Sequence, residues 1–236
     1  MKFLMFTLAG PLICFGETAR WDHRGTEDMP TKSAVIGLLG CCLGLPRGDA
    51  GLCRLDEKLH MAAWREQSGP LLTDFQTVQS PTGAILNAMR KPRGSTIITP
   101  KQYLQDAVFH VLLYGDDDLL TECEAAMRRP KWVVSLGRRG CPPSVPIVPH
   151  VFEAATVREA LEKHAVPSPD REGKPPRKAQ DPMRCEVEYV EGMDIRDYPG
   201  AYRTVRHDAV IRADENQYGD RQVLSLPLER SVIACT

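Results

Sequence analysis

Basic side chains without acidic neighbours are the first feature of this sequence that could do chemistry. The stretch from Phe75 to Gln105 contains no Asp or Glu but carries Arg90, Lys91, Arg93 and Lys101. Clustered Lys and Arg without nearby carboxylates attract phosphates, so the stretch is typical of a surface that binds a polyanion. A solvated basic loop would have the same composition, and the stretch alone favours neither interpretation.

A second acid-free window runs from Ala125 to Phe152 and again contains several basic residues. Gly137 and Gly140 bracket two of them, Arg138 and Arg139. We expect these two guanidinium groups to lie on a sharply turned backbone. Two such windows in one chain favour polyanion binding more strongly than either window does alone.

The segment PTKS at residues 30–33 predicts the start of a helix that ends at Gly44. Thr31 or Ser33 is expected to cap the first backbone amides, and glycine is the usual residue after a helix end. An exposed helix start with Lys32 and free amides would be an anion site. The alternative is a core helix whose first turn is merely solvated.

An acidic turn is the first candidate for catalysis. Tyr114-Gly115-Asp116-Asp117 resembles the metal-binding turn of palm-type polymerases. Two-metal chemistry needs a further carboxylate, and the expected first strand has none. A helix is expected directly after the turn, so capping by Asp117 or Asp118 explains the acidic residues better.

Metal-free RNA cleavage is the second candidate, with Lys101, Tyr103 and His110 moving the proton. Nothing in the sequence brings these three together, and His110 lies in an apolar segment typical of a satisfied core histidine. The motifs GxSxG, HExxH and the P-loop are absent. We therefore expect binding rather than catalysis, with no catalytic residue, no metal and no cofactor.

Composition limits the remaining functional classes. The chain has 236 residues, a hydrophobic content of 42%, a charged content of 26% and a net charge of −1. These values are typical of a globular protein with a sizeable core. A chain so close to neutral does not coat nucleic acid non-specifically, so a polyanion contact must be a local patch.

The cysteines and the N-terminus indicate the compartment. Eight cysteines are scattered without a CxxC pair or zinc-like spacing, which favours reduced, cytoplasmic thiols. Gly10-Pro11 interrupts the apolar run from Phe3 to Phe15, and no small-x-small cleavage site follows, so we expect a buried strand rather than a signal peptide. No stretch approaches about 20 uninterrupted apolar residues, so no membrane span is expected.

The apolar pattern predicts an α+β chain in two regions. Residues 1–152 read as strand, helix, short helix, strand, strand, a return strand and a further helix, the order of a ferredoxin-like domain with helices over one face of an antiparallel sheet. Residues 76–102 would form a basic finger between two of these strands. Residues 153–236 read as a smaller β-rich region with a helix at 153–164, a Pro-rich linker at 165–182, and strands at 185–190 and 221–226.

Five segments, taken in order, resemble one protein family. They are KFLMFTLAGPLICFGE at 2–17, PTKSAVIGLLGCCLGL at 30–45, DFQTV at 74–78, YLQDAVF at 103–109 and LGRRGCPP at 136–143. Together they are similar to the CasD family, the RAMP subunits of the type I-E CRISPR Cascade complex. The resemblance extends from Met1 to about Pro146 and is weak in the remainder of the chain.

The resemblance implies both a fold and a role. The fold is a ferredoxin-like (RRM/RAMP) domain with a β-hairpin thumb and a small β-rich C-terminal region, in a prokaryotic cytoplasm. The role is a non-catalytic crRNA-binding subunit that caps the 5′ handle of the guide RNA and anchors neighbouring subunits for antiviral DNA recognition. The implied partners are the backbone subunit CasC, the large subunit CasA and, as a further candidate, CasE. In type I-C relatives the equivalent subunit cuts precursor crRNA, so a metal-independent endoribonuclease is the alternative.

The expected RNA contacts come from the N-terminal loop, the helix start, the thumb and the glycine-bracketed turn. The residues are Arg20, Lys32, Ser33, Gln76, Arg90, Lys91, Arg93, Lys101, Arg138 and Arg139. A single-stranded handle also offers unstacked bases, on which aromatic side chains can stack. The aromatic candidates are Trp21, Phe75, Tyr103 and Trp132.

Overall fold

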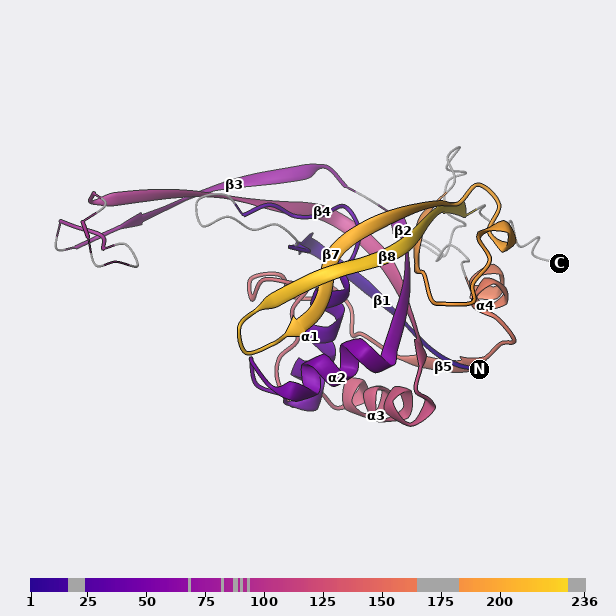
Figure 1. Ribbon diagram of the computed structural model, residues 1–236. Helices are drawn as coiled ribbons and strands as arrows, with labels where there is room; N and C mark the ends of the chain where they lie inside the picture. Colours follow the sequence, from indigo (N-terminus) through magenta and orange to yellow (C-terminus); the bar gives the residue numbers. More distant parts are fainter. Residues whose placement is uncertain are drawn as a thin grey trace.

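A large antiparallel sheet forms the centre of the protein (Figure 1). The computed structural model describes residues 1–16, 24–67, 69–81, 83–86, 89, 91–92, 94–164 and 183–228. Its strands are β1 (Lys2–Ile13), β2 (Leu59–Gln67), β3 (Leu71–Gln79), β4 (Thr96–Gly115), β5 (His150–Glu153), β6 (Met183–Glu188), β7 (Tyr202–Arg212) and β8 (Gln217–Leu228). The strand order is β5-β1-β4-β2-β6-β8-β7, and β3 pairs with β4 off this path.

Three helices cover one face of the sheet (Figure 1). They are α1 (Lys32–Leu43), α2 (Ala50–Lys58) and α3 (Asp117–Arg128). Alternate residues of β1, such as Leu4 and Phe6, point to this face because side chains of a strand alternate between its two sides. They pack with Leu39 of α1 and Leu120 of α3 in the larger core cluster.

The opposite face of the sheet has a second core cluster. Phe3, Trp64 and Tyr114 come from the central strands, and Leu161 comes from α4 (Val157–His164). A short 3-10 helix (Ile195–Asp197) also lies between β6 and β7. The central strands are thus covered on both sides, which explains their nearly continuous apolar sequence.

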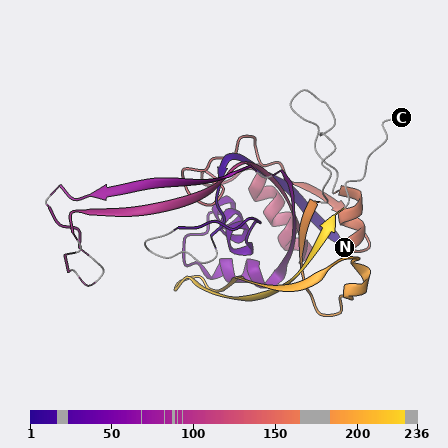
Figure 2. The ribbon, with the colours of Figure 1, turned by 90° about the horizontal axis from the view of Figure 1, so that it is seen from above.

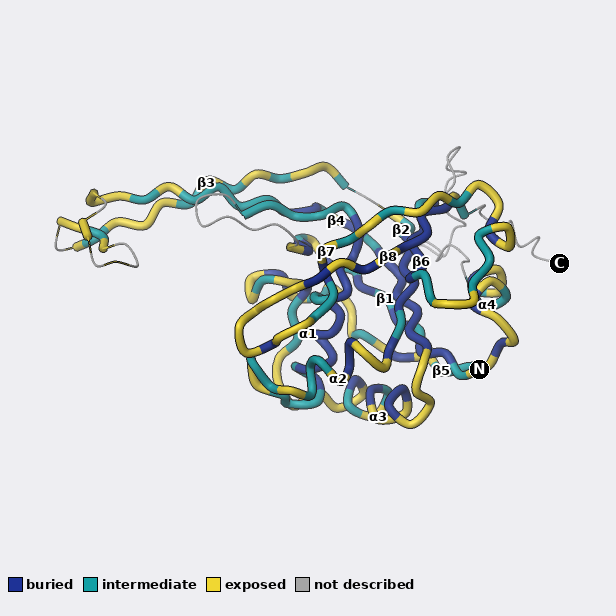
Figure 3. The backbone as a smooth tube through the Cα atoms, in the orientation of Figure 1, coloured by how far each residue is buried: buried dark blue, intermediate teal, exposed yellow. Residues whose placement is uncertain are grey.

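The β3–β4 hairpin projects from this body as a long two-stranded arm (Figures 1 and 2). The inner half of β4 pairs with β1 and β2, while its outer half pairs with β3 from Thr96 to Leu104. Figure 3 shows the arm as exposed or intermediate along its length, whereas the strands of the body are mostly buried. One continuous strand therefore connects the core to the tip of the arm.

The structure corrects several sequence-based expectations. Asp116 caps α3, because its carboxylate accepts a hydrogen bond from the Leu119 amide, so the assignment to Asp117 or Asp118 was wrong. Residue 153 ends β5 instead of opening a helix, and strands β5 and β7 were not expected. The alternation in β7 is obscured by irregular pairing with β8 near Arg206 and Val210.

Strands β6 and β8 extend the sheet that the N-terminal strands begin, through the pairing of β2 with β6. The division into residues 1–152 and 153–236 stays a prediction, and its linker at 165–182 lies outside the described residues. Each helix in the described part of the chain is too short or too polar to span a lipid bilayer. All seven cysteines of the described part are free thiols.

Candidate nucleic-acid interface

One face of the β3–β4 hairpin carries no charge. Directly paired residues share a face, and on this side the pairs include Phe75 with Pro100 and Thr77 with Ile98. Leu71 is 53% exposed, Phe75 66% and Ile98 48%. A row of large apolar side chains exposed on an arm is typical of a surface that contacts another protein.

The opposite face of the hairpin has polar side chains at its centre, between the apolar pairs Leu72 with Tyr103 and Val78 with Ile97. Asp74 pairs with Lys101 across the two strands, and the Lys101 ammonium donates a hydrogen bond to Oε1 of Gln76. The Gln76 amide in turn donates to Asp74 Oδ2 at 2.6 Å. This network orients the lysine and the amide side chain, and we call this side the polar face of the hairpin.

The turn at residues 136–141 lies against the end of β1. Gly137 has a φ of +92°, and a Cβ atom there would lie 1.8 Å from the carbonyl oxygen of Cys14, so only glycine fits. The Cys14 amide donates to Leu136 O at 3.2 Å, and the Cys141 amide donates to Arg138 O at 2.9 Å. The sharply turned backbone that the two glycines predicted is present.

The two adjacent arginines of this turn have different surroundings. The Arg138 guanidinium donates to the carbonyl oxygens of Gln102 at 2.9 Å and Arg24 at 2.8 Å, and it lies 4.6 Å from the centre of the Tyr103 ring. Arg138 therefore joins the turn to the base of the polar face. Arg139 is exposed and has no hydrogen bond or ion pair with any described residue, so its charge is available to a ligand.

The start of α1 is closed by the protein itself. The Lys32 amide donates to Asp208 Oδ2 of β7 at 2.6 Å, and Thr31 makes no side-chain capping bond. Ser33 is half-buried and its hydroxyl lies 3.4 Å from that of Thr31. The expectation of an exposed helix start, capped by Thr31 or Ser33, was wrong.

Lys32 is buried, with 3% of its surface exposed. Its ammonium lies 2.9 Å from Glu188 Oε1 and donates to the Asp56 carbonyl at 2.8 Å. Arg221 holds Asp208 by two hydrogen bonds of 2.8 Å, which completes a buried ionic network between α1 and strands β6 to β8. Lys32 is thus a structural cation here and is not presented to a ligand.

The three residues considered for RNA cleavage do not come together. Lys101 and His110 lie nine positions apart on the single strand β4, a separation of about 30 Å in extended chain. His110 is buried, with its ring stacked on Trp64 and its two nitrogens 3.0 Å from Thr7 Oγ1 and 2.5 Å from Glu66 Oε2. The prediction of a satisfied core histidine is confirmed.

Of the expected contact residues, Gln76 and Lys101 lie on the polar face of the hairpin, and Arg138 packs against the base of that face. Arg139 is exposed at the next position of the same turn. Lys91 is exposed near the hairpin tip. Arg20, Arg90, Arg93 and Trp21 lie outside the described residues. The aromatic candidates divide, because Tyr103 is buried beneath Arg138 whereas Phe75 and Trp132 are exposed.

Comparisons with known proteins give consistent matches. The family model "CRISPR-associated protein (Cas_Cas5)" matches residues 3–214. The CRISPR system Cascade subunit CasD of Escherichia coli (strain K12) is 34% identical over 173 residues, which cover 68% of this chain and 75% of the relative.

Two solved structures are similar over nearly the whole chain. A chain of a CRISPR RNA-guided surveillance complex is 27% identical with a TM-score of 0.72, and the match covers 97% of this chain and 90% of that one. A crystal structure of a Cas protein is 25% identical with a TM-score of 0.65, covering 97% of this chain and 95% of that one. The mixed α/β architecture with its large antiparallel sheet is therefore shared with these proteins.

Proposed function

Because the chain belongs to the Cas5 family of CRISPR-associated proteins, we propose that it is a crRNA-binding subunit of a type I-E Cascade complex that caps the 5′ handle of the guide RNA. The observation that carries the proposal is the meeting of both acid-free windows in space. Arg138 joins the surface of the second window's turn, where Arg139 is exposed, to the polar face of the first window, which carries Lys101. Such a surface suits a single-stranded RNA backbone.

The fold supports a ferredoxin-like core with a thumb. That topology agrees with the order of the elements along the chain, which is β1, α1, β2, β4, α3, β5 with α2 as an additional helix. It also agrees with the order of the strands in the sheet, which is β5-β1-β4-β2. The β3–β4 hairpin is the thumb in this proposal. The strands β6 to β8 would be the smaller C-terminal region.

The two faces of the thumb suit two kinds of partner. The polar face would contact the guide RNA, because phosphates require cations and hydrogen-bond donors. The uncharged face with Leu71, Phe75 and Ile98 would contact the backbone subunit CasC, because large apolar side chains supply most of the free energy of protein association. CasA and CasE would be neighbours in the same complex, and target DNA would be met through the assembled complex.

We propose that the subunit is not an enzyme. The separation of Lys101 from the buried His110 argues against the proton transfer that metal-free cleavage needs. The test is incubation of the purified protein with precursor repeat RNA in EDTA. Intact RNA is expected, and specific cuts below the repeat hairpin would favour the endoribonuclease.

Binding is tested by co-expression with the other Cascade subunits and a repeat–spacer RNA. Guide RNA should be recovered in the complex that co-purifies with this chain carrying an affinity tag. The recovered RNA should start with the intact 5′ handle. A complex without RNA, or a chain recovered alone, would refute the proposed role.

A further inference from the structure

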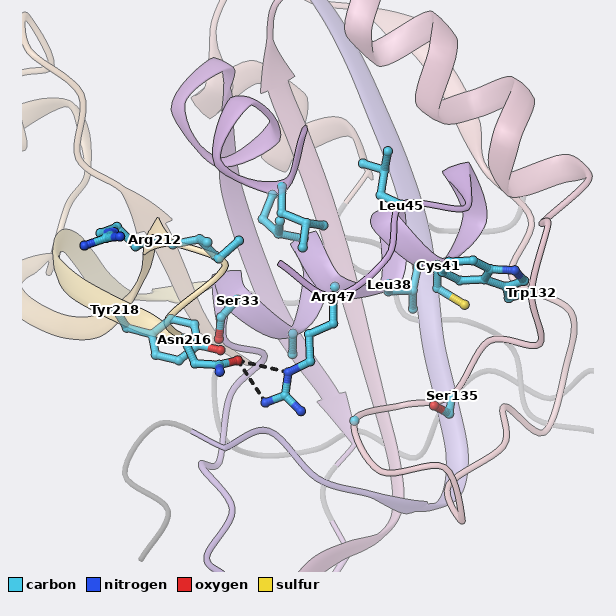
Figure 4. A pocket seen from close by; sticks show the side chains of 17 residues that line it. Ser33, Leu38, Cys41, Leu45, Arg47, Trp132, Ser135, Arg212, Asn216 and Tyr218 are labelled. Atoms are coloured by element: carbon cyan, nitrogen blue, oxygen red, sulfur yellow. Dashed lines mark hydrogen bonds between the residues drawn. The ribbon is translucent and has the colours of Figure 1, made fainter. Parts of the chain in front are cut away.

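A cavity of about 440 Å³ lies between α1, the segment around Trp132 to Gly137, and the turn that joins β7 to β8 (Figure 4). Ser33 and Gly37 of α1 line one side, and Gly37 leaves space there because it has no side chain. The size is within the range of sites for small ligands or single nucleotides. Polar groups and apolar side chains both line it, which is typical of a specific binding site.

Arg47 is one of two arginines that line this cavity, and a neutral partner holds it in place. Its Nε and Nη2 atoms donate to Oδ1 of Asn216 at 3.0 and 2.8 Å (Figure 4). Among the described residues Arg47 forms no ion pair, so its full positive charge remains available. The neighbouring Arg212, in contrast, lies 3.3 Å from Asp214 and 2.8 Å from Glu215.

The position of Asn216 fixes this arrangement. Asn216 has a φ of +52°, in the left-handed region that Asn adopts more readily than most residues. Its amide uses two of the five N–H donors of the guanidinium, and the others remain for a ligand. A planar guanidinium oriented in this way can bind a phosphate through two parallel hydrogen bonds.

Two aromatic residues also line the cavity. Trp132 is 49% exposed and Tyr218 is 38% exposed, and Figure 4 shows them on opposite sides of Arg47. Partly exposed aromatic rings beside a cation are the usual elements of sites for unpaired nucleobases.

The cavity borders the turn of residues 136–141. Ser135 and Gly137 line it, and the exposed Arg139 follows two residues later in the same turn. A phosphate bound by Arg139 would therefore lie close to this wall of the cavity.

We propose that this cavity binds one nucleotide of the guide RNA, with its phosphate on Arg47 and its base against Trp132. The inference depends on the proposed function and adds a site on the body of the protein. Three of its residues, Arg47, Asn216 and Tyr218, lie outside both acid-free windows.

Asn216→Asp gives the sharpest test, because it retains the shape of the side chain and its tolerance of positive φ but neutralises Arg47. If Arg47 only joined its own loop to the turn between β7 and β8, the new ion pair would preserve that link, and RNA binding would not change. If Arg47 binds phosphate, affinity should fall about tenfold. The slope of log K against log salt should then decrease in magnitude by about 0.7, the loss of one phosphate contact on a single strand.

The measurement is fluorescence anisotropy of the full chain with a labelled RNA oligonucleotide of the handle sequence. Arg47→Ala should reproduce the effect of Asn216→Asp, and Trp132→Ala should lower the affinity about tenfold whereas Trp132→Phe retains most of it. Arg54→Ala is the matched control, since Arg54 is exposed but lies outside the cavity. It should bind like the wild-type protein.

The outcomes separate the inference from the proposed function. The cavity site alone would be overturned if Asn216→Asp and Arg47→Ala kept the wild-type affinity and salt slope while Arg139→Ala bound RNA more weakly. A wild-type chain that does not bind the handle RNA at all would overturn both. Thermal melts of the variants show whether each one is folded.

Discussion

At the scale of single residues, Arg138 and Arg139 show that adjacent identical side chains can have different roles. The sequence predicts both as RNA contacts because glycines bracket them. The carbonyl oxygens that fix Arg138 come from Gln102 and Arg24, distant in sequence, and no local pattern indicates them. Only Arg139 has the freedom that a phosphate ligand needs.

The two variants should therefore behave differently. Arg139→Ala should lower the affinity for handle RNA and reduce the salt slope by about 0.7, with an unchanged melting temperature, because it removes one phosphate contact. Arg138→Ala should lower the melting temperature, since it removes the hydrogen bonds that join the turn to Gln102 and Arg24 at the base of the hairpin. Anisotropy titrations at several salt concentrations and thermal melts measure both effects. Equal melting temperatures for the two variants would contradict this division.

Lys32 belongs to the fold rather than to the ligand site. Lys32→Ala removes the cation from the buried carboxylate of Glu188, and breaking such a pair costs about 3–5 kcal/mol of unfolding free energy. Chemical denaturation measures this loss. Lys163→Ala, which removes an exposed pair with Glu159 on α4, is the control and should change stability little. A similar small change for Lys32→Ala would exclude the structural role.

Glu188 should make this network sensitive to acid. Burial raises the pKa of its carboxyl, but the hydrogen bond from His60 and the charges of Lys32 and Arg221 outweigh burial and hold the pKa below its ordinary value of 4.5. A carboxylate with a lowered pKa stabilises the folded state above the ordinary value, and this contribution is lost as the pH falls through the lowered one. Denaturation of wild type and Glu188→Gln between about pH 6 and pH 3 should thus converge on acidification. A constant difference would contradict this assignment.

At the scale of elements, the hairpin has two different faces, and the composition of its sequence does not distinguish them. The acid-free stretch predicts a basic finger, but strand alternation places Phe75 and Lys101 on opposite faces. The register of β3 with β4 decides which side chains share a face, and the composition of the stretch does not give that register. The buried closure of α1 by Asp208 was beyond prediction for a related reason, because β7 was not recognised as a strand.

Substitutions on the two faces should have separable effects. Phe75→Ser should weaken association with CasC about tenfold or more, because it removes an exposed aromatic ring whose burial would stabilise the complex. Lys101→Gln should instead reduce the salt slope of RNA binding by about 0.7. Pull-down with tagged CasC and RNA anisotropy measure the two effects, and each variant is the control for the other. Loss of RNA binding by Phe75→Ser with CasC association intact would reverse the assignment of the faces.

At the scale of the whole molecule, most of the N-terminal architecture could be predicted. The apolar run of β1, the Gly44 end of α1 and an extended segment around residues 71–78 all follow from local rules. The extension of the sheet by β6 to β8 could not, because it depends on pairing between β2 and β6 more than 100 residues apart. The cavity at Arg47 is likewise formed by segments remote in sequence.

The net charge of −1 is compatible with RNA binding at a local surface. Many cations are neutralised by internal pairs, such as Arg206 with Glu186 and Arg221 with Asp208, whereas Arg139 and Arg47 have no ion pair among the described residues. A chain without overall positive charge can therefore bind RNA through one local surface.

Photo-crosslinking in the assembled complex tests the central claim most directly. The guide RNA would carry 4-thiouridine either in the 5′ handle or in the spacer. The complex would be assembled from this RNA and all the subunits and then irradiated, and the crosslinked peptides would be identified by mass spectrometry. Handle positions should crosslink to this chain, at the polar face of the hairpin or the turn of residues 136–141. Crosslinks to this chain from the opposite end of the guide RNA, with none from the 5′ handle, would contradict the proposed role.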